Sequence, residues 1–286
     1  MRGFELVHPA TLGEAIALLD TDDESVRAFS GGTALMLMLK SGLYKPTRFV
    51  HLGAVEAAHA RIEATPDGGL RIGAMATLSA LEHNAEVAKT APVISRAMKH
   101  LSNVRVRNVA RVGGALAHGD PHMDLPPILA ALGADVVVAG PRGERRIAVE
   151  ALYTGYYETA LTRGELIVAA VVPAQAGWRS VYLKCTTRAA EDWPALGVAV
   201  SIRLDGGVIA DARVMIGAAT AMLTRATSAE AALRGAPANA ATFERAAEAA
   251  AAATETIDDA SGSAAYKTEL LRVYLRRALA QAIAGE

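Results

Sequence analysis

Two Gly-Gly pairs, Gly31-Gly32 and Gly113-Gly114, constrain most strongly what this chain can fold into. Glycine lacks a Cβ atom and adopts positive φ readily, so such pairs occur where the backbone turns sharply or where its N–H groups approach a negative group closely. Each pair follows a strand-like or Val-rich segment and precedes a helical one, and a helix N-terminus behind such a turn favours phosphate. Either pair alone is most simply a tight turn. Together they predict a nucleotide held between two lobes.

The known phosphate-binding motifs do not account for these pairs. Neither pair completes G-x-G-x-x-G and no Walker A sequence is present, so a dinucleotide-binding Rossmann unit and a P-loop are both unsupported. Asp124 follows the second pair, beyond a loop that contains Pro121. Its carboxylate could accept hydrogen bonds from ribose hydroxyls.

The segment between the second Gly-Gly pair and the next predicted helix has two interpretations. His118, Asp120, His122 and Asp124 alternate with residues that cannot ligate a metal. Two imidazoles and two carboxylates could hold zinc or a non-haem iron. Alternatively, the segment is a polar loop whose carboxylates cap the following helix, because a glycine and a proline inside it leave the direction of its turn undetermined.

A second polar segment follows one predicted strand and precedes another. It contains Lys184, Arg188, Glu191, Asp192 and Trp193. In the simpler interpretation it is a solvated hairpin loop with one exposed aromatic side chain. In the functional one, the aromatic ring lies against a planar ligand and the lysine lies near the ligand's charge. The sequence pattern does not decide between them.

Length and composition restrict the class of protein. A chain of 286 residues suits two domains or subdomains. Its 52% hydrophobic and 21% charged residues are typical of a soluble globular protein, and a net charge of −1 gives no sign of nucleic-acid or membrane-surface binding. No apolar run approaches the roughly 20 residues of a membrane span, and no signal peptide is evident, so we expect a cytoplasmic protein. Cys185 is the only cysteine, so the chain cannot ligate an iron–sulfur cluster through its own thiolates.

The predicted elements divide into two domains near residue 175. A helix is expected from Thr11 to Leu19, with Thr11 as N-cap and Glu14 completing a capping box. The remainder of domain 1–175, in lobes of about 1–55 and 56–175, has predicted strands at 26–30, 48–52, 70–76, 134–139, 146–149 and 166–172, and predicted helices at 34–40, 92–101 and 125–132. In domain 176–286, three predicted strands (180–186, 195–204 and 208–217) precede helices that include 236–253 and 264–284.

Taken together, the motifs resemble a known family. The chain is similar over its whole length to the FAD-binding medium subunit of molybdenum hydroxylases, which include aerobic carbon monoxide dehydrogenase, the xanthine dehydrogenase flavin domain and bacterial N-heterocycle hydroxylases. The landmarks are Gly31–Leu35, Ile72–Thr77, Val112–Gly114 with Ala117–Pro121 and Asp124, Gly155–Tyr157 with Thr159, Leu161, Glu165, Leu166 and Pro173, Tyr182–Lys184 with Arg188, and Ser263–Lys267.

The resemblance implies a fold and a cofactor site. It implies an α+β protein with a two-lobed, PCMH-type FAD-binding domain, followed by a C-terminal domain of a three-stranded antiparallel sheet with helices. FAD would lie extended between them, with its pyrophosphate at the first Gly-Gly loop, Asp124 at the adenosine end and Trp193 beside the isoalloxazine. The implied cofactor-binding residues are Gly31, Gly32, Thr33, Ala34, Leu35, Thr77, Leu101, Val112, Gly113, Gly114, Asp124, Ile167, Lys184 and Trp193. The resemblance favours no metal at 118–124 and no catalytic acid, base or nucleophile in this chain.

Two departures from the family pattern bear on the choice of substrate. Thr33 and Trp193 replace a histidine and a tyrosine of the carbon monoxide branch, so carbon monoxide is not assigned as the substrate. The lone Cys185 excludes the branch with an additional iron–sulfur cluster in this subunit, seen in 4-hydroxybenzoyl-CoA reductase.

The function implied is electron transfer. A large subunit with molybdenum–pterin would bind the substrate, a small subunit with [2Fe–2S] clusters would pass electrons to FAD in this chain, and quinone, oxygen or NAD would accept them. The expected assembly is a dimer of heterotrimers. Two alternatives are a free-standing FAD dehydrogenase and a non-catalytic assembly subunit without flavin, the second being disfavoured by the intact Gly-Gly pairs.

Overall fold

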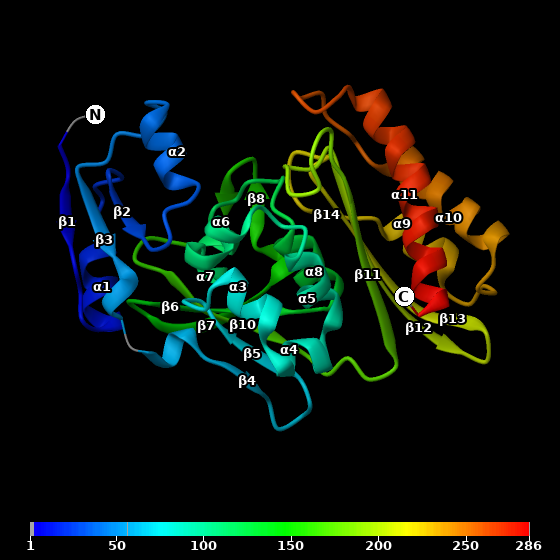
Figure 1. Ribbon diagram of the computed structural model, residues 1–286, viewed down its shortest axis with the longest axis horizontal. Coiled ribbons are helices and arrows are strands. Elements are labelled where there is room, and N and C mark those ends of the chain that lie inside the picture. The colour runs from blue at the N-terminus through cyan, green and yellow to red at the C-terminus, as the bar shows by residue number, and fades with distance from the viewer. Residues whose placement is uncertain (1–2, 56, 286) are drawn as a thin grey trace.

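The computed structural model describes residues 3–55 and 57–285. These residues form a three-stranded, a five-stranded and a four-stranded sheet, together with a two-stranded ribbon of β8 (Tyr153–Gly155) and β9 (Glu158–Thr159). The three larger sheets follow one another along the molecule, with the N-terminal sheet at one end and the C-terminal sheet at the other (Figure 1). The predicted α+β class is confirmed.

The N-terminal sheet is small and parallel. Its strands lie in the order β1 (Glu5–Val7), β3 (Arg48–His51) and β2 (Val26–Phe29). Helix α1 (Leu12–Leu19) packs on it and begins with the predicted capping box of Thr11 and Glu14. The first Gly-Gly loop connects β2 to α2 (Leu35–Lys40). Buried Leu166 from the central sheet belongs to this small core, so the N-terminal sheet packs against the central sheet.

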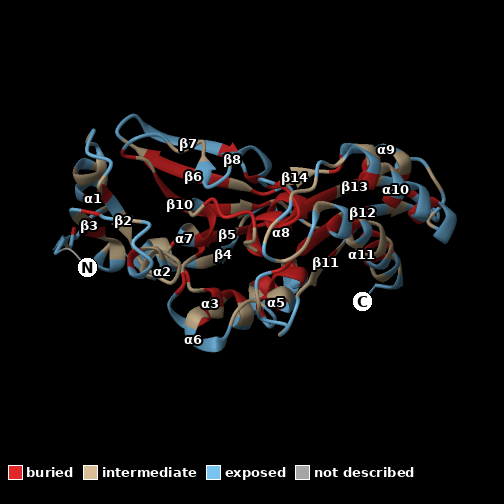
Figure 2. Ribbon diagram, turned by 90° about the horizontal axis from the view of Figure 1, so that it is seen from above, coloured by how far each residue is buried: buried red, intermediate tan, exposed pale blue. Residues whose placement is uncertain are grey.

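The central sheet is antiparallel and carries the largest core. Its strands are, in spatial order, β4 (Ile62–Ala64), β5 (Leu70–Gly73), β10 (Leu166–Val172), β6 (Asp135–Gly140) and β7 (Gly143–Ala148). The predicted hairpin at the 66–69 turn is the β4–β5 pair. Strand β10 is almost wholly apolar because it lies at the sheet's centre, as its burial in Figure 2 shows.

Helices surround this sheet. They are α3 (Leu78–His83), α4 (Ala85–Thr90), α5 (Pro92–Met98), α6 (Val104–Val109), α7 (Val112–Ala117) and α8 (Leu125–Ala131), with short 3-10 helices at Leu52–Ala54, Ala57–Ala60 and Val149–Ala151. One prediction is corrected here. Gly113-Gly114 was expected to form a turn, but both residues lie in the first helical turn of α7. Helix propensity disfavours glycine, yet packing of this turn decides the local structure.

The C-terminal sheet has one strand more than predicted. Its order is β11 (Trp178–Cys185), β12 (Leu196–Asp205), β13 (Val208–Gly217) and β14 (Thr224–Arg225). Strand β14 has two residues, too few for a recognisable alternating pattern, and it pairs with the end of β13. Helices α9 (Thr227–Leu233), α10 (Ala240–Ala253) and α11 (Ala264–Ala284) cover the sheet and share its core. No helix in the described part of the chain combines the length and apolar character that a bilayer crossing requires.

Candidate functional site

The first Gly-Gly loop lies tightly against the end of α6. Gly32 has φ of +66°, a conformation that glycine adopts at little cost. A Cβ atom on Gly31 would lie 2.1 Å from the carbonyl oxygen of Val109. Both glycines are therefore required by the shape and packing of the loop itself, whatever it binds.

The same loop presents unsatisfied backbone donors. Within the described residues, no acceptor is found for the N–H groups of Gly31, Gly32, Thr33 and Ala34, which are half-buried. Buried backbone N–H groups are nearly always paired with protein, water or ligand. Consecutive free donors beside a glycine of positive φ make a concave site that favours an anion such as a phosphate group.

The second Gly-Gly pair faces the first. The N–H groups of Val112 and Gly113 donate to the carbonyl oxygens of Ala76 and Ala74 at 3.0 and 2.7 Å, which fixes the start of α7 on the segment after β5. A Cβ on Gly113 would lie 2.8 Å from that of Ala74, whereas a Cβ on Gly114 would meet only the Ser30 Oγ, at 3.5 Å. The open side of Gly114 thus faces the first loop, and the structure brings the two pairs together as predicted.

Four other predicted residues form the framework around these loops. The Thr77 hydroxyl caps α3 by accepting from the Ala80 N–H at 3.0 Å, and Thr77 forms a β-bridge to the residue preceding α7. Val112 and Ile167 belong to the core and are 0% and 8% exposed. Leu101 is partly buried against the same core. Contacts of these residues with a cofactor stay a prediction.

Asp124 joins the start of α8 to strand β11. It accepts a 2.5 Å hydrogen bond from the Tyr182 hydroxyl and one of 3.2 Å from Lys184 Nζ, which also donates to the Asp192 carbonyl oxygen. The Asp124 and Lys184 side chains are each 8% exposed. Burial raises the pKa of Asp124, and Lys184 and Tyr182 oppose that rise. This ion pair is therefore costly to break.

The position of Asp124 makes two of the predicted FAD contacts incompatible: Asp124 at the adenosine end and Trp193 beside the isoalloxazine. Lys184 links Asp124 to Asp192, the neighbour of Trp193 in the chain. Asp124 and Trp193 thus lie in one cluster and cannot contact opposite ends of an extended FAD. Asp124 is the partner of Lys184, and a contact of Trp193 with the isoalloxazine stays a prediction.

The 118–124 segment holds a hydrogen-bonded cluster around His122. Its Nδ1 lies 2.9 Å from Asp120 Oδ1, and its Nε2 lies 3.0 Å from Asp259 Oδ2. Lys267 Nζ, which is fully buried, donates to the same Asp259 oxygen at 2.5 Å. Within the described residues, no group of three or more histidine, cysteine, aspartate or glutamate side chains is arranged to hold a metal ion.

Trp193 stands over this cluster. Its indole is stacked on the His122 ring, with centroids 5.9 Å apart and planes at 15°, and the residue is 56% exposed. The loop before it is closed by Asp192, whose N–H donates to the Ala189 carbonyl oxygen and whose carboxylate accepts from the Ala189 N–H. One indole face is thus supported while much of the side chain remains accessible.

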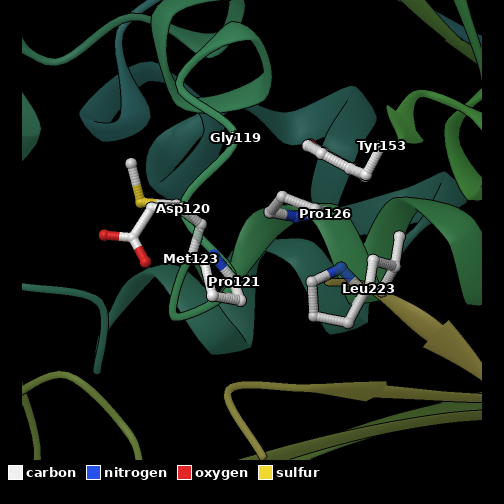
Figure 3. A pocket seen from close by; sticks show the side chains of 8 residues that line it. Gly119, Asp120, Pro121, Met123, Pro126, Tyr153 and Leu223 are labelled. Atoms are coloured by element: carbon white, nitrogen blue, oxygen red, sulfur yellow. The ribbon is translucent and has the colours of Figure 1, made fainter. Parts of the chain in front are cut away.

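The interior of the same loop is too small for a ligand. A cavity of about 10 Å³ is lined by Gly119, Asp120, Pro121, Met123, Pro126, Pro127, Tyr153 and Leu223, which is at most the space of one water molecule. In Figure 3 the Asp120 carboxylate points away from Tyr153 and Leu223. The interaction of Asp120 with His122 lies outside this small cavity, whose lining does not include His122.

Sequence reasoning missed three members of these clusters. Tyr182 and Lys267 were noted only as family landmarks, and Asp259 and Lys267 lie far from the 118–124 segment along the chain. The available signal was weak: an aspartate in a Gly/Ser-rich turn and a lysine one turn into an amphipathic helix. Only the folded chain brings them to His122.

Comparisons with known proteins match both parts of the chain. A family model described as the FAD binding domain in molybdopterin dehydrogenase matches residues 2–175, and one described as the CO dehydrogenase flavoprotein C-terminal domain matches residues 181–282. The nicotine 6-hydroxylase medium subunit of Paenarthrobacter nicotinovorans is 32% identical over 275 residues, 96% of this chain and 95% of that protein. The carbon monoxide dehydrogenase medium chain of Hydrogenophaga pseudoflava is 31% identical over 280 residues, 96% of each chain.

Solved structures agree over the full length. A chain of reconstituted CO dehydrogenase from Oligotropha carboxidovorans superposes with a TM-score of 0.94 at 29% identity, covering 100% of this chain and 99% of that one. A chain of quinoline 2-oxidoreductase from Pseudomonas putida 86 gives 0.92 at 29% identity, covering 99% and 98%.

Proposed function

The chain belongs to the family of FAD-binding medium subunits of molybdenum hydroxylases, and we propose that it carries FAD between the first Gly-Gly loop and the start of α7. It is the flavoprotein subunit of an oxidoreductase. The observation that carries the placement is the row of unpaired N–H groups at 31–34, which directly follows Ser30, the residue nearest the open side of Gly114. These donors fit the pyrophosphate of FAD.

Within the proposed site the protein's own residues bind FAD and orient it. The amides of the first loop hold the pyrophosphate, and the start of α7 closes the site from the other side. Helix α7 has six residues and is about 9 Å long, and the His122 cluster begins just beyond its C-terminus. Trp193 would then support the isoalloxazine. When bound, FAD exchanges electrons one or two at a time, and the surrounding groups set its position and potential.

The proposal extends to partners. A large molybdenum-binding subunit and a small iron–sulfur subunit would supply electrons, because the single cysteine of this chain cannot ligate a cluster. The heterotrimer would pair into a dimer, and quinone, oxygen or NAD would accept the electrons. The substrate would bind the large subunit.

The test is FAD binding by Gly114→Val. A Cβ atom at Gly114 would have open space around it except for the Ser30 hydroxyl, so the variant should fold and place its branched side chain where the pyrophosphate is expected. Gly13→Val is the control, because Gly13 also lies in the first turn of a helix, as the second residue of α1 where Gly114 is the third of α7, and has no atom within 4 Å of its Cβ position. We expect FAD affinity to fall at least about tenfold in Gly114→Val, about 1.4 kcal/mol, and to be unchanged in Gly13→Val. Equal affinity in both would contradict the placement.

The free-standing dehydrogenase remains the second candidate, and it needs a substrate pocket at the flavin. A second cavity, of about 280 Å³, is lined by residues such as Lys89, Arg96 and Trp178, and shares none with the proposed FAD site. It therefore gives this candidate no support.

A further inference from the structure

Several segments distant in sequence meet at His122. The 118–124 segment supplies the histidine and Asp120, the loop after β11 supplies Trp193, the 257–263 segment supplies Asp259, and α11 supplies Lys267. These contacts join the central part of the molecule to the C-terminal domain beside the proposed flavin site.

The hydrogen bonds of His122 define its charge. Both ring nitrogens lie at hydrogen-bond distance from carboxylate oxygens, at 2.9 Å for Asp120 and 3.0 Å for Asp259. An ionised carboxylate only accepts, and a neutral imidazole carries one N–H, so only the imidazolium donates to both. The charges balance, since two carboxylates face two cations, His122 and Lys267.

The two carboxylates fix the plane of the ring and therefore the plane of the indole. Asp120 and Asp259 hold opposite edges of the imidazole, and its face is left to Trp193. A cation against an indole face is attractive, most of all for tryptophan among the aromatic residues. Trp193 is 56% exposed, and its indole is stacked on the His122 ring.

We propose that His122 is a positioning residue of the flavin site: as an imidazolium held between Asp120 and Asp259, it orients the Trp193 indole that supports the isoalloxazine. The proposal rests on the FAD site proposed above. The orientation of Trp193 then depends on the charge state of His122.

Asp120, His122 and Asp259 together form what we call the clamp. The clamp should respond to pH. Burial opposes the charged ring, but the hydrogen bonds to Asp120 and Asp259 outweigh burial and raise the pKa of His122. The other ionisable groups of the cluster are Lys267 on Asp259, the Tyr157 hydroxyl on Asp120 at 2.9 Å, and His118, 4.0 Å from Asp120. Burial lowers the pKa of His118, so at a pH between the pKa values of the two rings His118 is neutral while His122 is charged. Above the pKa of His122, one of the two carboxylates loses its hydrogen bond from the ring, although Tyr157 and Lys267 still donate to Asp120 and Asp259, and the indole loses the cation beneath it.

The first test measures the fluorescence of Trp193 in the protein without flavin. The chain has two tryptophans, and Trp178 packs against Arg203 and Arg213 rather than the His122 cluster, so Trp178→Phe leaves Trp193 as the only reporter. Between about pH 5 and 9 its fluorescence should show a transition above the ordinary histidine range of about 6.5. His122→Gln should abolish the transition, and the matched control His118→Gln should keep it. A transition that survives in His122→Gln, or none in the parent, would overturn the clamp.

A second measurement needs no variant at this position. A long-range ¹H–¹⁵N spectrum of the histidine rings should show one imidazolium at neutral pH, with both nitrogens protonated. Neutral rings throughout would overturn the proposal even if His122→Gln failed to fold.

The third measurement links the clamp to FAD. A stacking contribution of about 0.5–1.5 kcal/mol corresponds to roughly 2- to 12-fold in affinity. His122→Gln should bind FAD more weakly by that factor below the transition, and the difference should close above it. Unchanged affinity at every pH in a variant that has lost the fluorescence transition contradicts this inference alone. Failure of the parent chain to bind FAD contradicts the proposed function, while the fluorescence and ring spectra still report on the clamp.

Discussion

At the scale of single residues, the glycines of the two pairs have different tasks. Gly31 and Gly113 are required because neighbouring backbone or side-chain atoms occupy the space of a Cβ, and Gly32 because of its positive φ. Gly114 is not required by packing. A Gly-Gly pair in sequence does not reveal this division, because packing and ligand approach call for the same missing Cβ.

Substitution should separate these tasks. Gly113→Val should expel FAD indirectly, because its side chain collides with Ala74 and displaces α7, with a stability loss of about 1–3 kcal/mol. Gly32→Ala should cost about 1 kcal/mol through its positive φ, and more because its Cβ would lie 2.6 Å from the Phe29 ring; Gly42→Ala is the control for φ alone, since Gly42 has φ of +74° and open surroundings. Urea unfolding measures stability, and FAD titration should show a loss for Gly32 that Gly42 does not share. Equal FAD affinity in the two alanine variants would argue against the first loop.

Trp193 is the residue expected beside the isoalloxazine. Trp193→Ala should weaken FAD binding by roughly 2- to 12-fold, as expected for the loss of one stacking contact, and should change flavin fluorescence. Trp193→Phe should restore much of both. An alanine variant with unchanged flavin fluorescence and affinity would return Trp193 to an exposed loop residue.

The charge on His122 also predicts how stability depends on pH. Its pKa is raised in the folded state, so its contribution is complete below the unfolded value of about 6.5 and is lost as pH rises through the folded value. The free energy of unfolding should therefore fall over this window in the parent and stay flatter in His122→Gln. Urea titrations at several pH values give the comparison, and parallel curves would exclude the linkage.

At the scale of elements, the buried Asp124–Lys184 pair connects α8 to β11. Lys184→Met should leave a buried carboxylate without its cation and destabilise the chain by about 3–5 kcal/mol. Adding Asp124→Asn should recover part of that loss, because the amide needs no counter-charge. Thermal unfolding of the two single variants and the double variant would test this, and additive losses would contradict the coupling.

Some helices and strands can be predicted from the local sequence pattern, and others cannot. The capping box of α1, the buried run of β10 and the bounds of α11 follow from their sequences, because each depends on residues a few positions apart. Strand β14 and the helical turn at Gly113 do not, since pairing with β13 and bonds to Ala74 and Ala76 decide them. The His122 cluster depends on Asp259, which only tertiary folding brings near.

At the scale of the whole molecule, the two candidate clusters lie at opposite ends of the short helix α7, and the C-terminal domain contributes to the second through β11 and α11. A cofactor that spans both would touch the N-terminal loop, the central helices and the C-terminal domain. FAD should therefore stabilise the fold as a unit, and the unfolding temperature should rise as the free FAD concentration is raised above its Kd.

The most direct test of electron transfer follows the visible absorption of the bound flavin under anaerobic conditions. We expect it to bleach when the reduced iron–sulfur partner subunit is added, and to remain that of oxidised flavin when carbon monoxide, a purine, an N-heterocycle or an aldehyde is added to this chain alone. Bleaching by one of these compounds without partner subunits would contradict the electron-transfer function and support a free-standing dehydrogenase.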